Sequence, residues 1–391
     1  MLTLFIFIAV LAVLVISHEL GHFVAARKSG MKVYEFGFGF PPRLCGVQKI
    51  TTETGASKWR FIWGRKEDEG TAGGTVYSFN IVPLGGFVRI KGEDGQEQGP
   101  DSFAAQKGWK RAVTLLAGVA MNVVLAFILL SIGFMAGSPQ STSSLPGGTT
   151  VENRHLEIME VMADKPASQA GLQSGDILVS LDAVQNPGVQ EMQEYINAHK
   201  DSNIKVVIKR GEEIIEKNIH PFVYEDTGKG ALGVSLVEVG LVKYPWYKAL
   251  YYGLLMTGLY LKGIVLSFYY LISGLFAGAP VGDSLSGPIG IAVMTGKVAK
   301  LGFSYLLNFM ALLSLNLAVL NVLPIPALDG GRLLFLIISK IKGKAVEQKS
   351  EQIAHTIGFL LLITLVVIIT VKDLGNFKGF FVGLIQRVTG S

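Results

Sequence analysis

The chain is poor in charged residues and nearly free of cysteine. Asp, Glu, Lys and Arg make up 17% of its 391 residues, and hydrophobic residues make up 50%. Soluble proteins usually carry about 25% charged residues, so this composition predicts an integral membrane protein with soluble parts. The single cysteine, Cys45, excludes an internal disulfide bond. The net charge of +5 is mild; it favours contact with a lipid bilayer, and no DNA- or RNA-binding motif points to a nucleic-acid partner.

Four apolar runs are long enough to cross a membrane as helices, which takes about 20 residues each. They are residues 2–26, 112–136, 301–323 and 353–371. The first run lacks the basic start and the small-residue cleavage site of a signal peptide, so we interpret it as a retained span. Lys and Arg follow the first run, precede the second and follow the third. The positive-inside rule therefore places these loops in the cytoplasm and the N-terminus outside.

A fifth apolar stretch, residues 246–276, complicates this count. A fifth crossing would place Asp329, which follows the third span, at the membrane face opposite His18 and His22 of the first span. We therefore predict a pair of amphipathic, interfacial helices here, with Lys248, Lys262 and several tyrosines at the level of the lipid headgroups.

A compact α/β module is expected at residues 152–224, after a Ser/Pro/Gly-rich linker at 138–151. Residues 166–176 match the pattern P-A-x-x-A-G-L-x-x-G-D at every fixed position and so resemble the bacterial PDZ domains. The resemblance implies a groove that binds a chain end or an extended peptide segment by strand addition. The alternative is a module that acts as a spacer or size filter. The residues expected in the PDZ loop are Ala170, Gly171, Leu172, Gly175 and Asp176.

The motif HELGH, residues 18–22, lies inside the first apolar run. On a helix, His18 and His22 share one face and can bind the same zinc ion, and Glu19 can act as general base on zinc-bound water. Ionisable residues inside a span are costly and are rarely kept without a use. The alternative is a pair of satisfied interior histidines with a glutamate that reaches the interface.

Catalytic zinc usually has three protein ligands, so a third must come from elsewhere. The best candidate is Asp329, which follows Pro324 and Pro326 in the third span. These prolines are expected to break the helix at a point where the backbone is buried in protein or lines a wet cavity. Taken alone, Asp-Gly-Gly is also an ordinary turn. Two other acidic residues, Glu35 and Asp373, lie in the wrong loop or at the wrong end of a span.

The combination of HExxH in the first span with N-x-x-P-x-P-x-L-D-G at residues 321–330 resembles the site-2 protease family of intramembrane zinc metalloproteases. The order of the parts resembles the bacterial regulator-of-sigma-E protease group, whose close members carry two PDZ domains where this chain has one. The resemblance implies that His18, His22 and Asp329 bind one Zn²⁺ ion and that Glu19 is the catalytic acid/base. It also implies that Asn321, and less directly Asn316, position the substrate.

The cytoplasmic stretch 29–108 contains strand-like segments rich in aromatic residues and glycine. Its motifs resemble those of the family loop that dips into the membrane beside the active site. We therefore expect Gly85, Gly86 and Phe87 to belong to a strand edge that holds the substrate; the alternative is a purely structural β-domain. Gly118 and Asn122, one helical turn apart in the second span, favour close helix packing over a polar contact at the site.

The expected fold is a polytopic α-helical membrane protein with four transmembrane helices, a cytoplasmic membrane-associated β-rich loop and an extracytoplasmic α/β PDZ domain. The expected segments are the first span at 1–28, the β-rich region at 29–108, the second span at 109–137, the linker at 138–151, the PDZ domain at 152–224, a linker with interfacial helices at 225–300, the third span at 301–335, a cytoplasmic loop at 336–352, the fourth span at 353–372 and a tail at 373–391.

The expected function is hydrolysis of peptide bonds within the transmembrane segments of single-span proteins, such as anti-sigma factors or remnant signal peptides. The expected location is the bacterial inner membrane, with the active site near the cytoplasmic face. The alternative function is a non-catalytic, PDZ-bearing membrane adaptor with a structural metal site. A metal transporter is less favoured, because the second and fourth spans contain almost no ionisable residues.

Overall fold

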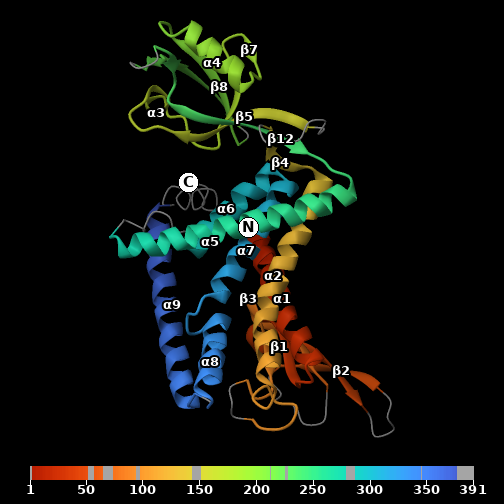
Figure 1. The fold of residues 1–391 in the computed structure, drawn as a ribbon. Helices are drawn as coiled ribbons and strands as arrows, with labels where there is room; N and C mark the ends of the chain where they lie inside the picture. The colour runs from red at the N-terminus through yellow and green to blue at the C-terminus, as the bar shows by residue number, and fades with distance from the viewer. Residues whose placement is uncertain are drawn as a thin grey trace, which may run out of the picture. The chain divides into compact units, whose positions relative to one another are not determined.

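The structure is a computed structural model, and Figure 1 shows its ribbon. The described residues are 2–51, 57–64, 74–93, 97–142, 151–211, 213–224, 228–278, 287–344 and 346–376. Most of the expected 138–151 linker and of the 373–391 tail lies outside them. The chain divides into two compact units, one formed by residues 1–130, 253–299 and 306–391 and the other by residues 131–252 and 300–305.

Helices occupy every run that the sequence marks as apolar. They are α1 (Leu2–Lys28), α2 (Gly108–Ala136), α5 (Trp246–Phe276), α6 (Pro288–Leu301), α7 (Phe303–Val322), α8 (Asp329–Lys342) and α9 (Gln348–Asn376). Among the described residues, five helices are long and apolar enough to cross a membrane: α1, α2, α5, α7 and α9.

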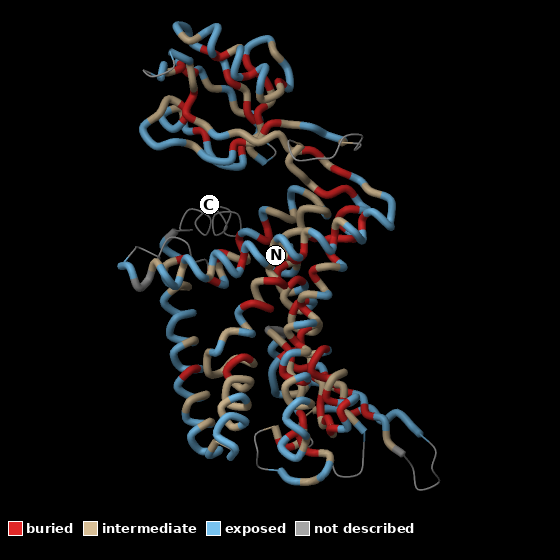
Figure 2. The backbone as a smooth tube through the Cα atoms, viewed as in Figure 1, coloured by how far each residue is buried: buried red, intermediate tan, exposed pale blue. Residues whose placement is uncertain are grey.

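The core of the helical unit lies where α1, α2 and α7 meet. Its buried side chains include Leu14 of α1, Leu130 of α2 and Leu315 of α7. The Ser314 hydroxyl donates to the Asn122 carbonyl oxygen over 2.8 Å and joins α7 to α2 in this core. By contrast, α9 is exposed along most of its apolar length (Figure 2). An apolar helix that leaves its side chains uncovered is suited to lipid contact.

Residues 246–276 form one continuous helix, α5, where the sequence analysis expected a pair. The segment contains no proline, and isolated glycines do not stop a helix, so nothing in it breaks the backbone hydrogen bonding. In Figure 1, the part of α5 that belongs to the helical unit runs across the page, whereas α1, α2 and α9 run down it. Its length and composition would also suit a span.

The helical run of the third span stops at the two prolines, as expected from their lack of a backbone N–H. α7 ends at Val322, and α8 begins at Asp329. The loop between them turns tightly against its neighbours: a Cβ atom on Gly331 would lie 2.8 Å from the carbonyl carbon of Ile325. Only a glycine allows this approach, so the two glycines after Asp329 let α8 start directly beneath the broken end of α7.

The β-rich region forms a three-stranded antiparallel sheet in the order β2-β1-β3. The strands are β1 (Val33–Thr51), β2 (Ser57–Trp63) and β3 (Val76–Ile90), which match the three strand-like segments of the sequence. One end of the sheet packs on α1 and α2 through a cluster that includes Phe23, Ile90 and Leu115. Packing of this kind fixes β3 against the same helix that carries HELGH.

The second unit is an α/β module around a seven-stranded sheet, whose main path runs β4-β12-β5-β6-β8-β9. Its elements are β4 (Ser138–Ser141), β5 (Val151–Val161), α3 (Pro166–Gln169), β6 (Ile177–Leu181), β7 (Val184–Gln185), α4 (Val189–Ala198), β8 (Ile204–Arg210), β9 (Glu213–Ile219), β10 (Phe222–Val223), β11 (Gly230–Ala231) and β12 (Val234–Val242). The sheet extends beyond the expected limits of 152–224, because β12 pairs with β5 along its length and with β4 at its end.

Candidate metal centre

Three side chains meet where α1 faces the start of α8. His18 Nε2 lies 3.1 Å from Asp329 Oδ2, and His22 Nε2 lies 3.3 Å from the same oxygen. The two histidine Nε2 atoms are 3.1 Å apart. Both histidines are buried, and Asp329 is partly buried. The helix spacing of four residues places the imidazoles on one face, and the break after α7 delivers the carboxylate to them.

The donor set fits a zinc ion. Zn²⁺ binds His nitrogen and carboxylate oxygen at about 2.0–2.2 Å in a tetrahedral arrangement, which puts two ligand atoms about 3.3–3.5 Å apart. The three separations in this site, 3.1 to 3.3 Å, are close to that edge length. Asp329 Oδ2 is buried without a hydrogen bond of regular geometry, as expected for an acceptor that faces a cation. Three protein ligands leave a fourth position for water or substrate.

The Nδ1 atom of each histidine faces a polar group of α2. His22 Nδ1 lies 2.8 Å from the Thr114 carbonyl oxygen, so its N–H donates there and leaves Nε2 free for a metal. His18 Nδ1 lies 3.3 Å from the Asn122 amide nitrogen, while Asn122 Oδ1 is buried without a partner. Rotating the amide by half a turn would let His18 Nδ1–H donate to Oδ1 and satisfy both groups. The two contacts together would orient both imidazoles toward Asp329.

Glycines let α1 and α2 come this close. A Cβ atom on Gly118 would lie 2.7 Å from His18 Cε1 and 2.8 Å from His22 Cε1. A Cβ atom on Gly21 would lie 2.9 Å from the Gly118 Cα atom. Real Cβ atoms do not approach other atoms so closely. A residue with a side chain at position 118 would therefore collide with the two imidazoles, and only glycine fits there. Packing alone was the favoured interpretation of Gly118 and Asn122, and it was incomplete: the same turn also contacts both histidines.

Glu19 and the β-rich region meet at Gly86. A Cβ atom on Gly86 would lie 3.4 Å from Glu19 Cγ, so the backbone of β3 passes directly beside the glutamate. Gly85 has a φ of 106° and packs on the Phe40 ring. The ring of Phe87 covers Gly37 on β1. Of the three residues expected to hold the substrate, Gly86 is therefore brought to the site, and the other two shape the strand around it.

The two asparagines of α7 differ in their contacts. Asn321 Nδ2 lies 3.4 Å from His18 Nε2, at the edge of the metal centre. Asn316 instead donates to the Leu312 carbonyl oxygen within its own helix. The alternative acidic residues are engaged elsewhere: Glu35 forms an ion pair with Arg43, and Asp373 accepts the Gly290 N–H.

The five residues expected in the PDZ loop lie at the end of α3 and in the turn that follows it. Gly171 and Gly175 have φ values of 79° and 88°, which favour glycine. Asp176 is buried and accepts the Gln173 N–H over 2.9 Å. It also accepts a hydrogen bond from the Arg210 guanidinium, and this second bond raises the pKa of Arg210. Among the described residues, none of the five lines the groove between α4 and β12. The contacts of these five residues stabilise the turn after α3.

Comparisons with known proteins fit this geometry. Residues 6–64 and 57–365 match the model of peptidase family M50. The chain belongs to this family. It is an intramembrane zinc metalloprotease of the site-2 type, and zinc is its metal. Its apolar helices and its family place this M50 peptidase in a membrane.

Several relatives match this M50 peptidase over nearly its whole length. A Clostridium perfringens protein with a provisional zinc metalloprotease name is 31% identical over 373 residues, covering 95% of this chain and 98% of the relative. Zinc metalloprotease RasP of Geobacillus kaustophilus is 28% identical and covers 95% of this chain and 97% of its own. A solved PDZ domain of an SdrC-like protein from Listeria monocytogenes covers 22% of this chain and 92% of that domain, at 24% identity and a TM-score of 0.21.

One residue that supports the Asp329 loop of this peptidase was missed by sequence reasoning. His355 of α9 accepts the Ala327 N–H at Nδ1 over 2.8 Å. Ala327 has a φ of 81°, a strained conformation for a residue with a side chain, and lies two residues before Asp329. α9 also packs tightly here, because a Cβ atom on Gly358 would lie 2.7 Å from the Pro326 carbonyl carbon. The strained loop is therefore supported by α9, and a lone histidine in an apolar span was the available signal.

Replacing His355 with Ala is expected to weaken zinc binding about tenfold. The change removes the acceptor for a partly buried N–H, a loss of about 1 kcal/mol, and releases the loop that carries Asp329. His355→Asn keeps an acceptor atom at the position of Nδ1 and should restore most of the affinity. Competition with a fluorescent zinc chelator measures the effect. Thr364→Ala, which removes a hydroxyl bonded within the same helix, is the matched control and should bind zinc like the parent. Equal affinities for the Ala and Asn variants would contradict this role.

Proposed function

We propose that this M50 peptidase cuts peptide bonds inside the transmembrane segments of single-span membrane proteins, with His18, His22 and Asp329 as zinc ligands and Glu19 as the general base. The observation that carries the proposal is the meeting of three ligand atoms within 4.8 Å, two of them on the apolar helix α1 and one at the start of α8, beside a strand backbone. A site that only needed a structural metal would normally close its coordination with a fourth protein ligand.

The residues of the site divide the chemistry among them. Bound zinc supplies a Lewis acid that polarises the scissile carbonyl and activates water. Glu19 accepts the proton of the attacking water and passes it to the leaving amine. Asn321, whose Nδ2 lies 3.4 Å from His18 Nε2, is expected to donate to the carbonyl oxygen that becomes negative during attack. Thr114 and Asn122 keep the imidazoles oriented throughout, because each faces the Nδ1 atom that points away from the metal.

The substrate is expected to bind as an extended strand along β3. A peptide bond in a membrane helix must be unwound before attack, and its freed N–H and C=O groups then need partners that lipid cannot offer. Val76–Phe79 of β3 pair with two parts of β1, whereas Gly86–Ile90 pair with one, so among the described residues only this second part of β3 has an open edge. Gly86 puts this strand next to Glu19. A substrate strand paired at Gly85–Phe87 would present its backbone to the base.

We further infer four spans, α1, α2, α7 and α9, with α5 lying at the membrane interface. The crosswise direction of α5 in Figure 1 supports this assignment. The basic residues beside α1 and α2 favour a cytoplasmic β-rich region and an extracytoplasmic PDZ-like module in the bacterial inner membrane. His18 lies ten residues before the end of α1, about 15 Å along the helix, which puts the metal nearer the cytoplasmic face.

The PDZ-like module is expected to take up an extended segment between α4 and β12. The groove there has a volume of about 700 Å³ and is lined by Val189 of α4 and Leu236 of β12, among others. β4 pairs only with Val239–Val242 of β12, so the first half of β12 keeps one open edge among the described residues. An open edge beside a groove suits strand addition. A size filter for the outer parts of substrates remains the alternative use.

A cleavage assay in lipid vesicles tests the proposed function. The parent protein is expected to cut a single-span test substrate without a bulky outer domain, and mass spectrometry should place the cut inside its transmembrane segment. A zinc chelator should stop the reaction, and added Zn²⁺ should restore it. The same substrate with a large folded outer domain reports whether the PDZ-like module filters by size. Zinc-loaded protein that leaves a series of such substrates intact would favour the adaptor function instead.

A further inference from the structure

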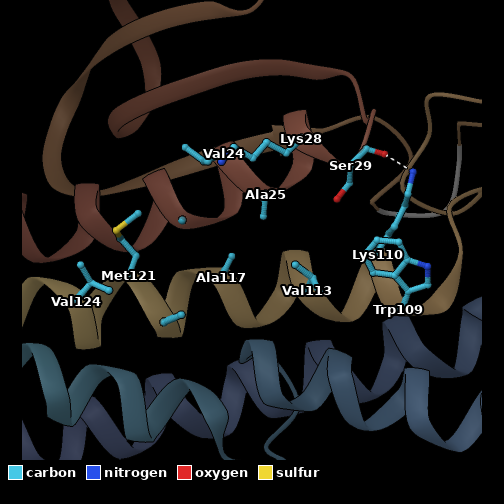
Figure 3. A pocket seen from close by; sticks show the side chains of 12 residues that line it. Val24, Ala25, Lys28, Ser29, Trp109, Lys110, Val113, Ala117, Met121 and Val124 are labelled. Carbon is cyan, nitrogen blue, oxygen red and sulfur yellow. Dashed lines mark hydrogen bonds between the residues drawn. The ribbon is translucent and has the colours of Figure 1, made fainter.

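An apolar groove runs between α1 and α2, and its lining does not include His18, His22 or Asp329 (Figure 3). Its volume is about 420 Å³. The floor exists because the contact residues are small: Gly21 and Ala25 come from α1, and Ala117 and Ala120 come from α2. Val24, Val113, Met121 and Val124 form its walls. None of these residues serves the metal centre directly, and nothing in the proposed catalysis uses the groove.

The groove has the length of one membrane leaflet. Its lining on α2 extends from Trp109 to Val124, which at about 1.5 Å per residue is about 22 Å. A bilayer with its headgroup regions is about 40–45 Å thick, so one leaflet measures about half of that. The deep part of the groove is therefore the length of one acyl chain, and its outer end reaches the headgroups.

Polar and basic residues gather only at this outer end. Ser29, Trp109 and Lys110 lie together there, and Lys28 precedes Ser29 (Figure 3). Lys110 donates to the Ser29 carbonyl oxygen over 2.9 Å, which fixes its ammonium group at the rim. Among the described residues that line the groove, none is acidic. One fixed ammonium group and a second lysine in the same lining, with no acidic residue among the described lining residues, are complementary to a lipid phosphate.

We propose that this groove binds one phospholipid with an anionic headgroup, whose acyl chain lies between α1 and α2 and whose phosphate contacts Lys28 and Lys110. A helix is about 10 Å across with its side chains, too wide to lie between two helices that touch at Gly21 and Ala117. The narrow groove therefore suits an acyl chain better than a substrate helix. The bound chain would cover the back of the α1–α2 contact that holds both imidazoles.

Native mass spectrometry of the full-length protein tests the proposal. Delipidated protein in detergent is titrated with phosphatidylglycerol or with phosphatidylcholine of the same acyl chains, and the first bound lipid is counted. The parent should retain the anionic lipid several-fold more tightly. Lys28→Gln should weaken that binding about fivefold, since one basic residue contributes on the order of 1 kcal/mol. Ala120 is an exposed residue of the groove floor, so Ala120→Phe fills the groove and should remove the tight binding altogether.

Lys107→Gln is the matched control, because Lys107 is an exposed lysine of the same membrane face that does not line the groove. It should bind phosphatidylglycerol like the parent. Unchanged zinc content confirms that each variant is folded. Equal retention of the two lipids by the parent, or an equal loss for Lys107→Gln and Lys28→Gln, would overturn the proposal. Because the readout is bound lipid, the outcome does not depend on whether the protein cleaves any test substrate.

Discussion

Glu19→Gln is expected to lower the rate of peptide cleavage about 10³-fold while leaving zinc bound. Glutamine has the size of glutamate and keeps an oxygen, but its amide cannot take the proton from the attacking water. General acid–base catalysis contributes about 10²- to 10⁴-fold, and the loss should fall in this range. Zinc should remain because its expected ligands are His18, His22 and Asp329. Single-turnover cleavage in vesicles gives the rate, and elemental analysis gives the zinc content.

Two further variants separate a chemical effect from a structural one. Glu213→Gln changes an exposed glutamate at the start of β9 and should leave both the rate and the zinc content unchanged. His18→Ala should lose zinc and activity together, because it removes a ligand. A Glu19→Gln protein that keeps zinc and still cleaves within tenfold of the parent rate would show that another group accepts the proton.

The zinc-binding half of the site could be predicted because its information is local. Two histidines four residues apart share one face of a helix. The length of the apolar run predicted that this segment is a helix, and α1 confirms it. Asp329 is different, because it lies more than 300 residues further along the chain. Its prolines predicted the break after α7, and its depth in the membrane, matching that of HELGH, favoured it as a ligand; the family resemblance implied the same before the structure brought the two motifs together.

The supporting residues could not be assigned from local patterns. Gly118 and Asn122 are spaced one turn apart whether they pack against a helix or hold a histidine, so the spacing does not distinguish the two roles. His355 supports Ala327 across a gap of 28 residues. α5 and β12 were missed for another reason: hydrophobic content alone does not say whether a segment turns back on itself or joins a distant sheet.

Gly118→Ala is expected to reduce zinc affinity about 10- to 100-fold, the range seen when groups behind a metal ligand are changed. The new methyl group would lie 2.7 Å from His18 Cε1, so either imidazole must turn away or α2 must move back from α1. Both movements disturb the contacts of Thr114 and Asn122 with the histidine Nδ1 atoms. Chelator competition measures the affinity, and cleavage in the presence of saturating zinc measures what activity remains.

Gly108→Ala makes the same chemical change at the first residue of the same helix, where a Cβ atom would meet nothing within 4 Å. It should leave zinc affinity and cleavage at parent values, so any difference between the two variants reports the space beside the imidazoles. Restored cleavage of Gly118→Ala at saturating zinc would mean that the methyl group weakens only metal binding. Persistent loss with zinc bound would mean that the position of the imidazoles, relative to Glu19 and the backbone of β3, also limits catalysis. Parent-like zinc affinity in Gly118→Ala would contradict the close approach of α2 to the metal centre.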